Sequence, residues 1–378
     1  MLKLYDTIII GAGIAGATAA YMLTQQDQKV LVLDKKGIAS GGSGAAGAFV
    51  SPKIGKGSPL QTLTNEAFSF AKEFYLKTCP EYFHQTGVIR LPKDEVDAEK
   101  FSEYEKFNDT AYEIYTKEKL DALGIQAHFN SFYFPDAGDC DAVAVCKNLL
   151  SDIDIMMVEV MVLHREDNAW IIVGQDALFP TIKAKNIILA TGHESNLSDL
   201  RYMGIRGTWG TRGDFNTALE LKVSMHQAMS VGANIDGILK LGATHEKEVK
   251  EVQPCREAEA LSLKEKASAL IETSDLALKE LFCGMRAGSK DYFPLVGKVI
   301  DVAYMLEKYP EIVRGAKPEF SYVENLYILN GLGGRGFVFA PLMAKWLAQY
   351  IVEGKEIDKR VNADRLFLKW CRKTVGSI

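Results

Sequence analysis

The sequence has few cysteines, and none is spaced as in a zinc ribbon or a thioredoxin-like motif. The six are Cys79, Cys140, Cys146, Cys255, Cys283 and Cys371, with no C-x-x-C pair among them. No His, Cys or Asp cluster has the spacing of a metal site, so we expect no metal. Scattered cysteines of this kind favour free, buried thiols in a reducing cytoplasm.

Long hydrophobic runs are also missing. Ile8, Ile9 and Ile10 lead directly into glycine, so we expect no signal peptide. The longest other apolar stretch, 337–352, contains Pro341 and a lysine and is shorter than the ~20 residues that cross a bilayer. The 378 residues, 47% of them hydrophobic, instead predict a large core in about two or three domain-sized units, without a membrane segment.

A strong charge of one sign is absent from the whole chain but not from its C-terminus. The net charge of −5 argues against a wholly basic nucleic-acid binder. Residues 355–378 hold seven Lys and Arg against three acids, so this tail carries +4 and the rest of the chain −9. Two interpretations stay open, a surface that neutralises phosphates or a solvated helix that packs through Leu366, Phe367 and Trp370.

The sequence does contain a dinucleotide-binding pattern. The apolar run 5–10 predicts a buried strand, GAGIAG follows at 11–16, a helix comes next, and a second strand at 29–33 ends at Asp34. Strand, glycine turn, helix, strand and acid in this order are specific for a Rossmann-type unit.

Each residue of the glycine turn has an expected role. Gly11 makes the tight turn, Gly13 lets the backbone approach a pyrophosphate, and Gly16 lets the helix pack on the strand. Ile14 and Ala15 begin the helix, whose N-terminus faces the phosphates.

The acid after the second strand completes the pattern. We expect Asp34 to accept a hydrogen bond from a ribose hydroxyl. Lys35 and Lys36 follow it, and they either meet a 2′-phosphate or lie at the surface. The pattern does not by itself choose FAD over NAD.

The segment 38–50, IASGGSGAAGAFV, consists almost entirely of small residues. A planar ring or a pyrophosphate fits close to such a backbone, with Ser43 donating to a phosphate and Ala46 in contact with the cofactor. The alternative is a flexible glycine–serine loop.

Later segments return the chain to the same sheet. We expect strands at 156–163, 169–173, 184–189 and 325–329. The expected cofactor contacts beside them are Val160, Ala190, Thr191, Gly192, Gly331, Gly333, Gly334, Arg335 and Gly336. The last five form a glycine loop that offers backbone N–H groups to the electron-rich edge of a flavin, before an amphipathic helix that we expect to open at Pro341. A plain strand–helix turn is the alternative.

These four segments, in this order, resemble the D-amino-acid oxidase family of FAD enzymes, which includes glycine oxidase. The resemblance implies an α/β (α+β two-domain) fold, with a Rossmann-like FAD-binding domain and a substrate domain built on an antiparallel sheet. We place the FAD domain at 1–80, 140–205 and 280–378, and the substrate domain at 81–139 and 206–279. Residues 256–281 have the spacing of a charged, solvated helix on the substrate domain.

Within this family the sequence is most similar to the oxidoreductase domain of the bifunctional MnmC-type enzymes, which modify the tRNA wobble uridine. The similar segments are 41–53 (GGSGAAGAFVSPK), 283–297 (CGMRAGSKDYFPLVG), 331–341 (GLGGRGFVFAP) and 362–366 (NADRL). Ala45–Ala46 and Gly333–Gly334 depart from the usual residues. The methyltransferase domain has no counterpart, so we expect a separate methyltransferase to act on the product.

The resemblance implies oxidation of a carboxymethylamine: 5-carboxymethylaminomethyluridine in tRNA becomes aminomethyluridine and glyoxylate. Arg286 matches the arginine that binds the substrate carboxylate, and a structural ion pair is the alternative. Lys53, Thr244 and His245 are further candidates for catalysis, and each has an ordinary structural alternative.

Two other functions stay open. A small free amino acid such as glycine or sarcosine would use the same fold, FAD and Arg286. A non-catalytic flavoprotein would bind FAD without being reduced by any amine. An NADP-dependent reductase is disfavoured because the sequence has no second dinucleotide motif.

Overall fold

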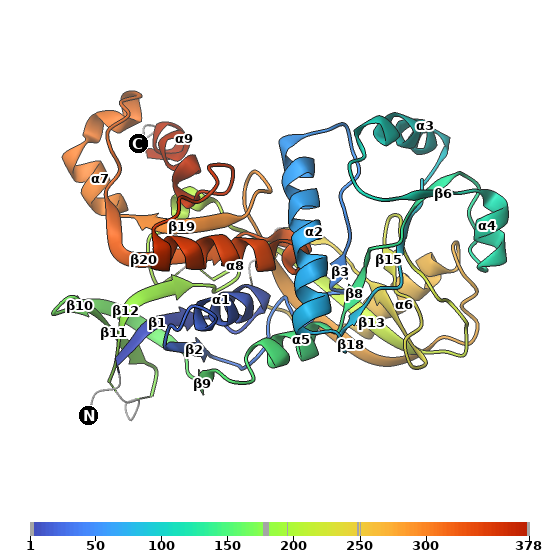
Figure 1. The fold of residues 1–378 in the computed structure, drawn as a ribbon, viewed down its shortest axis with the longest axis horizontal. Coiled ribbons are helices and arrows are strands. Elements are labelled where there is room, and N and C mark those ends of the chain that lie inside the picture. Colours follow the sequence, from blue (N-terminus) through green and yellow to red (C-terminus); the bar gives the residue numbers. More distant parts are fainter. Residues whose placement is uncertain (1–3, 177–180, 195, 248, 250, 376–378) are drawn as a thin grey trace.

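The computed structural model describes residues 4–176, 181–194, 196–247, 249 and 251–375, which form two lobes side by side (Figure 1). The first lobe is built on an eight-stranded sheet with the order β10-β11-β12-β1-β2-β9, in which β20 also pairs with β12 and β19 with β20. Its strands are β1 (Leu4–Ile10), β2 (Val30–Asp34), β9 (Asp154–Met157), β10 (Val160–Glu166), β11 (Ala169–Gly174), β12 (Ile182–Leu189), β19 (Leu295–Ile300) and β20 (Tyr322–Asn330).

The central pairs of this sheet are parallel, as the dinucleotide pattern predicts. β1 lies between β2 and β12, with Ile9 opposite Val32 and Ile188. All three side chains are fully buried, which is why the apolar run shows no alternation. The carboxyl ends of these strands therefore meet at one edge of the sheet.

Helices cover this sheet and join the two lobes. Figure 1 shows α1 (Ile14–Thr24) beside α8 (Gly336–Glu353), and α2 (Pro59–Thr78) standing across the junction of the lobes. The remaining helices of this lobe are α5 (Ala142–Leu149), α7 (Val302–Lys308) and α9 (Phe367–Trp370). Small residues of α1 such as Ala17 and Ala20 are fully buried, which lets α8 pack close to it.

The second lobe is built on a nine-stranded sheet with the order β17-β13-β16-β15-β14-β5-β7-β6, with β18 paired to β13. Apart from the parallel pair β5–β14, its pairs are antiparallel. Its strands are β5 (Val88–Arg90), β6 (Glu113–Tyr115), β7 (Ser131–Phe134), β13 (Arg206–Asn216), β14 (Ser224–His226), β15 (Ser230–Val231), β16 (Ile238–Gly242), β17 (Glu246–Lys247) and β18 (Ala277–Gly288). Its helices are α3 (Glu95–Tyr104), α4 (Lys117–Ala122) and α6 (Glu257–Ala267). A small sheet of β3 (Phe49–Val50), β8 (Gly138–Cys140) and β4 (Phe83–His84) lies between the lobes.

Three expected elements have other boundaries. The strand expected at 156–163 is two strands, because β9 pairs with β2 and β10 pairs with β11. The helix expected at 256–281 ends at Ala267, and β18 then pairs with β13 along its length, so the antiparallel sheet continues to Gly288.

The helix expected to open at Pro341 begins instead at Gly336, with the proline inside it. A proline at this position leaves the carbonyl of Phe337 without its helical N–H partner. The hydroxyl of Tyr75 on α2 donates to that carbonyl at 2.9 Å, and this side chain is fully buried. The helix can therefore start directly after the glycine loop.

The cysteines are only partly as expected. Cys79, Cys140, Cys146 and Cys371 are free and buried. Cys255 and Cys283 form a disulfide, so the expectation of free thiols throughout is wrong. Their pairing depends on the loop before α6 lying against β18, which no local pattern reveals. Among the described residues, no helix is long and apolar enough to cross a membrane.

Candidate active site

A cavity of about 760 Å³ is lined by both lobes, and most of the sequence-predicted site residues surround it. The predicted residues in its lining are Gly11, Gly13, Ile14, Ala15, Asp34, Lys35, Ser43, Ala46, Lys53, Val160, Ala190, Thr191, Gly192, His245, Arg286, Gly331, Gly333, Gly334, Arg335 and Gly336. Gly16 and Thr244 are not part of the lining. Gly16 packs against Gly11, and the carbonyl of Thr244 accepts a hydrogen bond from Arg286.

The glycine turn leaves no room for side chains. Gly11 has φ of +113°, and a Cβ there would lie 2.3 Å from the carbonyl oxygen of Ala190. A Cβ on Gly16 would lie 1.8 Å from the carbonyl oxygen of Gly11, so Gly16 lets α1 pack against the turn. The result is an α1 N-terminus that faces the cavity, a site suited to phosphate.

Asp34 shapes the end of β2. Its carboxylate accepts the N–H of Ala12 and the N–H of Lys36, each at 2.8 Å. Lys35 forms an ion pair with Glu194 at 2.7 Å. The carboxylate beside Lys35 makes this end of the cavity less favourable for a 2′-phosphate.

The small-residue loop approaches the second lobe closely. Ser43 accepts the N–H of Ile14 at 2.9 Å, which caps α1. A Cβ on Gly42 would lie 2.5 Å from the carbonyl oxygen of Met285. The glycine is therefore needed for contact with β18, and the loop is not a flexible linker.

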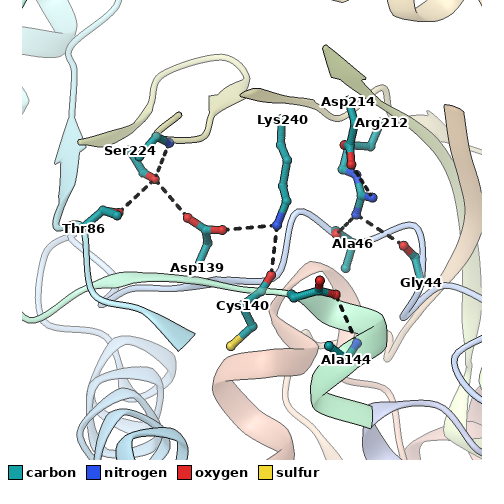
Figure 2. Close-up of polar contacts among 12 residues, drawn as sticks. Gly44, Ala46, Thr86, Asp139, Cys140, Ala144, Arg212, Asp214, Ser224 and Lys240 are labelled. Atoms are coloured by element: carbon teal, nitrogen blue, oxygen red, sulfur yellow. Dashed lines mark hydrogen bonds and ion pairs between the residues drawn. The ribbon is translucent and has the colours of Figure 1, made fainter. Parts of the chain in front are cut away.

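Arg212, which the sequence analysis missed, holds this loop in place. Figure 2 shows its guanidinium donating to the carbonyls of Gly44 and Ala46, and pairing with Asp214 at 2.8 Å. Only 5% of Arg212 is exposed. A buried charge with three partners fixes the loop against β13.

A second buried ion pair connects the lobes beside it. Lys240 on β16 donates to the carbonyl of Cys140 at 3.2 Å and pairs with Asp139 at 3.4 Å (Figure 2). Burial raises the pKa of Asp139, and the charge of Lys240 offsets this only in part. Ser224 also donates to Asp139, at 3.2 Å.

Arg286 lies on β18 with its guanidinium in the cavity lining. It donates to the carbonyl of Thr244 at 3.1 Å, and within the described part of the chain no carboxylate pairs with it. A Cβ on Gly210 would lie 2.6 Å from two guanidinium nitrogens, so this glycine makes room for them. Burial lowers the pKa of Arg286. A structural ion pair, the alternative role for this arginine, is thus not present.

His245 and Thr244 lie on the segment after β16. His245 lines the cavity, and its Nδ1 lies 3.0 Å from the carbonyl oxygen of Ala243. Because a carbonyl only accepts, Nδ1 carries the hydrogen and Nε2 is the acceptor. Burial, together with the charge of Arg286, lowers the pKa of His245, so the ring is neutral at pH 7. The hydroxyl of Thr244 accepts the N–H of Thr211 at 2.9 Å.

The glycine loop after β20 completes the site. Gly288 and Leu332 form a bridge that joins the strand of Arg286 to this loop, and Gly334 lies next to the Arg286 side chain. Two further lining residues, Arg90 and His226, were missed by the sequence analysis. A lone arginine in the apolar run Val88–Leu91 was the available signal for Arg90.

The lining fits a flavin dinucleotide. The α1 N-terminus and its glycine turn suit the pyrophosphate. Asp34 at the end of β2 suits the ribose, and a second glycine loop precedes α8. The described residues hold no group of three or more His, Cys, Asp or Glu placed to bind a metal.

The family described as DAO, FAD dependent oxidoreductase, matches residues 6–350. The chain belongs to this family. FAD is therefore its cofactor, and it is an amine or amino-acid oxidoreductase that acts on CH–NH bonds.

Two relatives are bifunctional proteins named tRNA 5-methylaminomethyl-2-thiouridine biosynthesis protein MnmC. The protein from Marinobacter nauticus is 26% identical over 95% of this chain, and the one from Maricaulis maris is 26% identical over 92%. The chain spans 58% and 52% of their lengths. The sequence resemblance to MnmC-type oxidases is thus confirmed as a distant one.

Solved structures show the same fold. Glycine oxidase from Bacillus cereus matches with a TM-score of 0.75 at 19% identity, over 93% of this chain and 96% of that one. Iminodiacetate oxidase from Chelativorans sp. BNC1 matches with a TM-score of 0.73 at 18% identity, over 94% and 98%. The expected two-domain fold of the glycine oxidase type is confirmed.

Proposed function

We propose that this enzyme oxidises the C–N bond of a carboxymethylamine, and that its substrate is 5-carboxymethylaminomethyluridine at the tRNA wobble position. The products are aminomethyluridine and glyoxylate. The observation that carries the proposal is Arg286, which lines the cavity and has no carboxylate partner among the residues that the structure describes. The names of the MnmC relatives, matched over nearly the whole chain, support the nucleoside as substrate.

We propose that FAD lies along the edge where β1, β2 and β12 end. In this arrangement the α1 N-terminus, with Gly11 and Gly13, holds the pyrophosphate, and Asp34 binds the ribose. The other proposed contacts are Ile14, Ala15, Lys35, Ser43, Ala46, Val160, Ala190, Thr191, Gly192, Arg286, Gly331, Gly333, Gly334, Arg335 and Gly336. We propose that the FAD domain comprises 1–80, 140–205 and 280–378 and that the remaining segments bind substrate, although β18 (Ala277–Gly288) pairs with β13 in the second sheet.

Arg286 orients the substrate. Its planar guanidinium pairs with the carboxylate through two parallel hydrogen bonds, and this fixes the adjacent CH₂. His245 lines the same cavity, and its neutral Nε2 is placed to accept a hydrogen bond from the substrate amine. The carbonyl of Thr244 accepts a hydrogen bond from the guanidinium and thereby fixes its position.

The flavin, when bound, accepts hydride from the CH₂ carbon. The substrate is then an imine, a two-electron oxidation product. Water adds to the imine carbon, and the C–N bond breaks to release the aminomethyl group and glyoxylate.

Product analysis tests the proposal. We expect tRNA carrying 5-carboxymethylaminomethyluridine to yield aminomethyluridine and stoichiometric glyoxylate, measured by mass spectrometry of the digested nucleosides. tRNA carrying unmodified uridine is the control. Turnover of glycine or sarcosine without turnover of this tRNA would contradict the nucleoside assignment.

A small free amino acid is the second candidate, and one observation favours it. Docking of tRNA on the basic tail requires free charges, but two arginines of the tail form ion pairs within the protein. Arg360 pairs with Asp358 at 2.6 Å and with Glu66 at 2.9 Å, and Arg365 pairs with Asp291 at 2.8 Å. With the tRNA substrate we propose a cytoplasmic location, and methylation of the aminomethyl product as the next reaction.

A further inference from the structure

Three cationic side chains besides Arg286 belong to the cavity lining. They are Lys53 after β3, Arg90 at the end of β5 and Arg335 in the turn before α8, and we refer to them as the Lys53 cluster. His226 on β14 is the register neighbour of Arg90 on the parallel strand β5, and it lines the cavity as well.

The Lys53 cluster has no acidic partner. Within the described residues no carboxylate is hydrogen-bonded or ion-paired to any of the three, and Arg335 donates only to the carbonyl of Ser51, at 3.4 Å. Two other cations of the same lining are neutralised, Arg212 by Asp214 and Lys240 by Asp139.

Three acids line the cavity, and all three lie beside strands of the first sheet. Asp34 ends β2, Glu159 lies between β9 and β10, and Glu194 follows β12. Asp34 binds backbone N–H groups and Glu194 pairs with Lys35. None of the three interacts with the Lys53 cluster.

Burial makes this concentration of charge unfavourable. Burial and the charge of Arg335 lower the pKa of Arg90 to about 9, and burial lowers the pKa of Arg335 to about 10. Burial, with the charges of Arg90 and Arg335, lowers the pKa of His226 to about 2, so its ring is neutral. All three side chains are half-buried. Charges held together there without partners cost free energy, and an anionic ligand would relieve that cost.

The phosphates of FAD have a cradle of their own. The α1 N-terminus, Gly13 and Ser43 lie on the first lobe, whereas Arg90 and His226 come from strands of the second sheet. Arg286 comes from β18, where its side chain lies between the Thr244 carbonyl and Gly334, the residue before Arg335.

We propose that the Lys53 cluster is a second anion site, which binds a carboxylate or phosphate group of the same substrate whose carboxymethyl group binds Arg286. The proposal rests on the proposed function and deepens it. In a tRNA substrate the second anion is a phosphate beside the wobble nucleoside, and in a small substrate it is a second carboxylate.

Two unreactive ligands that differ by one carboxylate test the proposal. Thiodiacetate and (methylthio)acetate share one carboxymethyl thioether, and their affinities for the FAD-loaded enzyme are measured from the change in flavin absorbance. We expect thiodiacetate to bind about tenfold more tightly or better, because its second carboxylate makes charge-assisted hydrogen bonds. Equal affinities in the unmodified enzyme would overturn the proposal.

Variants locate the effect. Lys53→Gln and Arg90→Gln should each remove most of the preference for thiodiacetate and leave (methylthio)acetate affinity unchanged. Lys93→Gln, which removes an exposed lysine near Arg90, is the matched control. Lys53 lies on a loop, so its variant serves if Arg90→Gln fails to fold. If Lys53→Gln still preferred thiodiacetate, the Lys53 cluster would not be the second anion site. The same would follow if Lys53→Gln lost affinity for FAD and not for thiodiacetate.

Inorganic phosphate distinguishes the source of the anion. Phosphate that displaces thiodiacetate but not (methylthio)acetate indicates a site for a nucleotide phosphate. Displacement of neither, with the thiodiacetate preference intact, indicates a site for a second carboxylate. The test is independent of tRNA turnover. If the enzyme forms product from the modified tRNA but shows no preference for thiodiacetate, only the second anion site is rejected. If it prefers thiodiacetate but forms no product from the tRNA, only the nucleoside substrate is rejected.

Discussion

Arg365 donates two parallel hydrogen bonds to Asp291, from Nε to Oδ2 at 2.9 Å and from Nη2 to Oδ1 at 2.8 Å. The same guanidinium donates to the carbonyls of Phe293 and Pro294, at 2.8 and 2.9 Å. It thereby ties the C-terminal segment to the turn that follows β18, the strand of Arg286. Arg365 lies in the segment 362–366 and Asp291 in the segment 283–297, both of which resemble MnmC-type enzymes. The contact shows that these two segments lie side by side in the fold.

Asp291→Asn should lower the free energy of unfolding at pH 7 by about 2 kcal/mol, because it leaves Arg365 without its carboxylate. Burial raises the pKa of Asp291, but the hydrogen bonds and charge of Arg365 outweigh this, and the net pKa lies below the ordinary 3.8. The ion pair therefore stabilises the protein fully above pH 3.8 and is lost as pH falls through the lowered pKa. Urea unfolding at pH 7 and below pH 3.8 should show the difference shrinking with acid.

The matched control is Asp199→Asn. Its partner Arg201 has a side chain that is 72% exposed, so this pair should contribute between about 0 and 1 kcal/mol. Equal losses in the two variants would mean that Arg365 does not anchor the turn.

Arg286→Ala should keep FAD and lose about 100-fold in the rate of flavin reduction, since the substrate carboxylate would lose its charge-assisted hydrogen bonds. Arg286→Lys should recover only part of this rate, because an ammonium does not pair in a bidentate fashion. Stopped-flow absorbance at saturating substrate measures both, with Arg201→Ala as an exposed control. A normal rate in Arg286→Ala would remove Arg286 from the mechanism.

Arg212→Gln should weaken FAD binding by about tenfold and lower the free energy of unfolding by about 3 kcal/mol. It frees the loop that contains Gly44 and Ala46, and it leaves Asp214 without a partner. Lys240→Gln is the comparison, since Lys240 contacts Asp139 and not this loop. It should cost stability with little change in FAD affinity, measured by flavin fluorescence. Equal FAD affinity in the two variants would contradict the role given to Arg212.

Tyr75→Phe should lower the free energy of unfolding by about 1–3 kcal/mol, because it leaves the Phe337 carbonyl buried without a donor. Tyr292→Phe, at a position that is 76% exposed, should change nothing measurable. Thermal unfolding of the FAD-loaded protein compares them. Identical melting temperatures for both variants would show that Pro341 needs no such partner.

Local spacing in the sequence predicts the dinucleotide unit well, because its strand, glycine turn, helix, second strand and acid follow one another between Leu4 and Asp34. Contacts between distant segments are beyond such patterns. Arg90 meets His226 only because β5 and β14 pair, and Cys255 meets Cys283 only because the loop before α6 reaches β18. The start of α8 was misplaced because the partner that makes Pro341 tolerable, Tyr75, comes from another helix.

The central claim is tested most directly by mixing the FAD-loaded enzyme anaerobically with tRNA that carries 5-carboxymethylaminomethyluridine and following the visible absorbance of the flavin. The account predicts bleaching with this tRNA, and none with unmodified tRNA, glycine or sarcosine. Bleaching by a small amino acid, with no response to the modified tRNA, would contradict it and assign the enzyme to the oxidation of free amino acids.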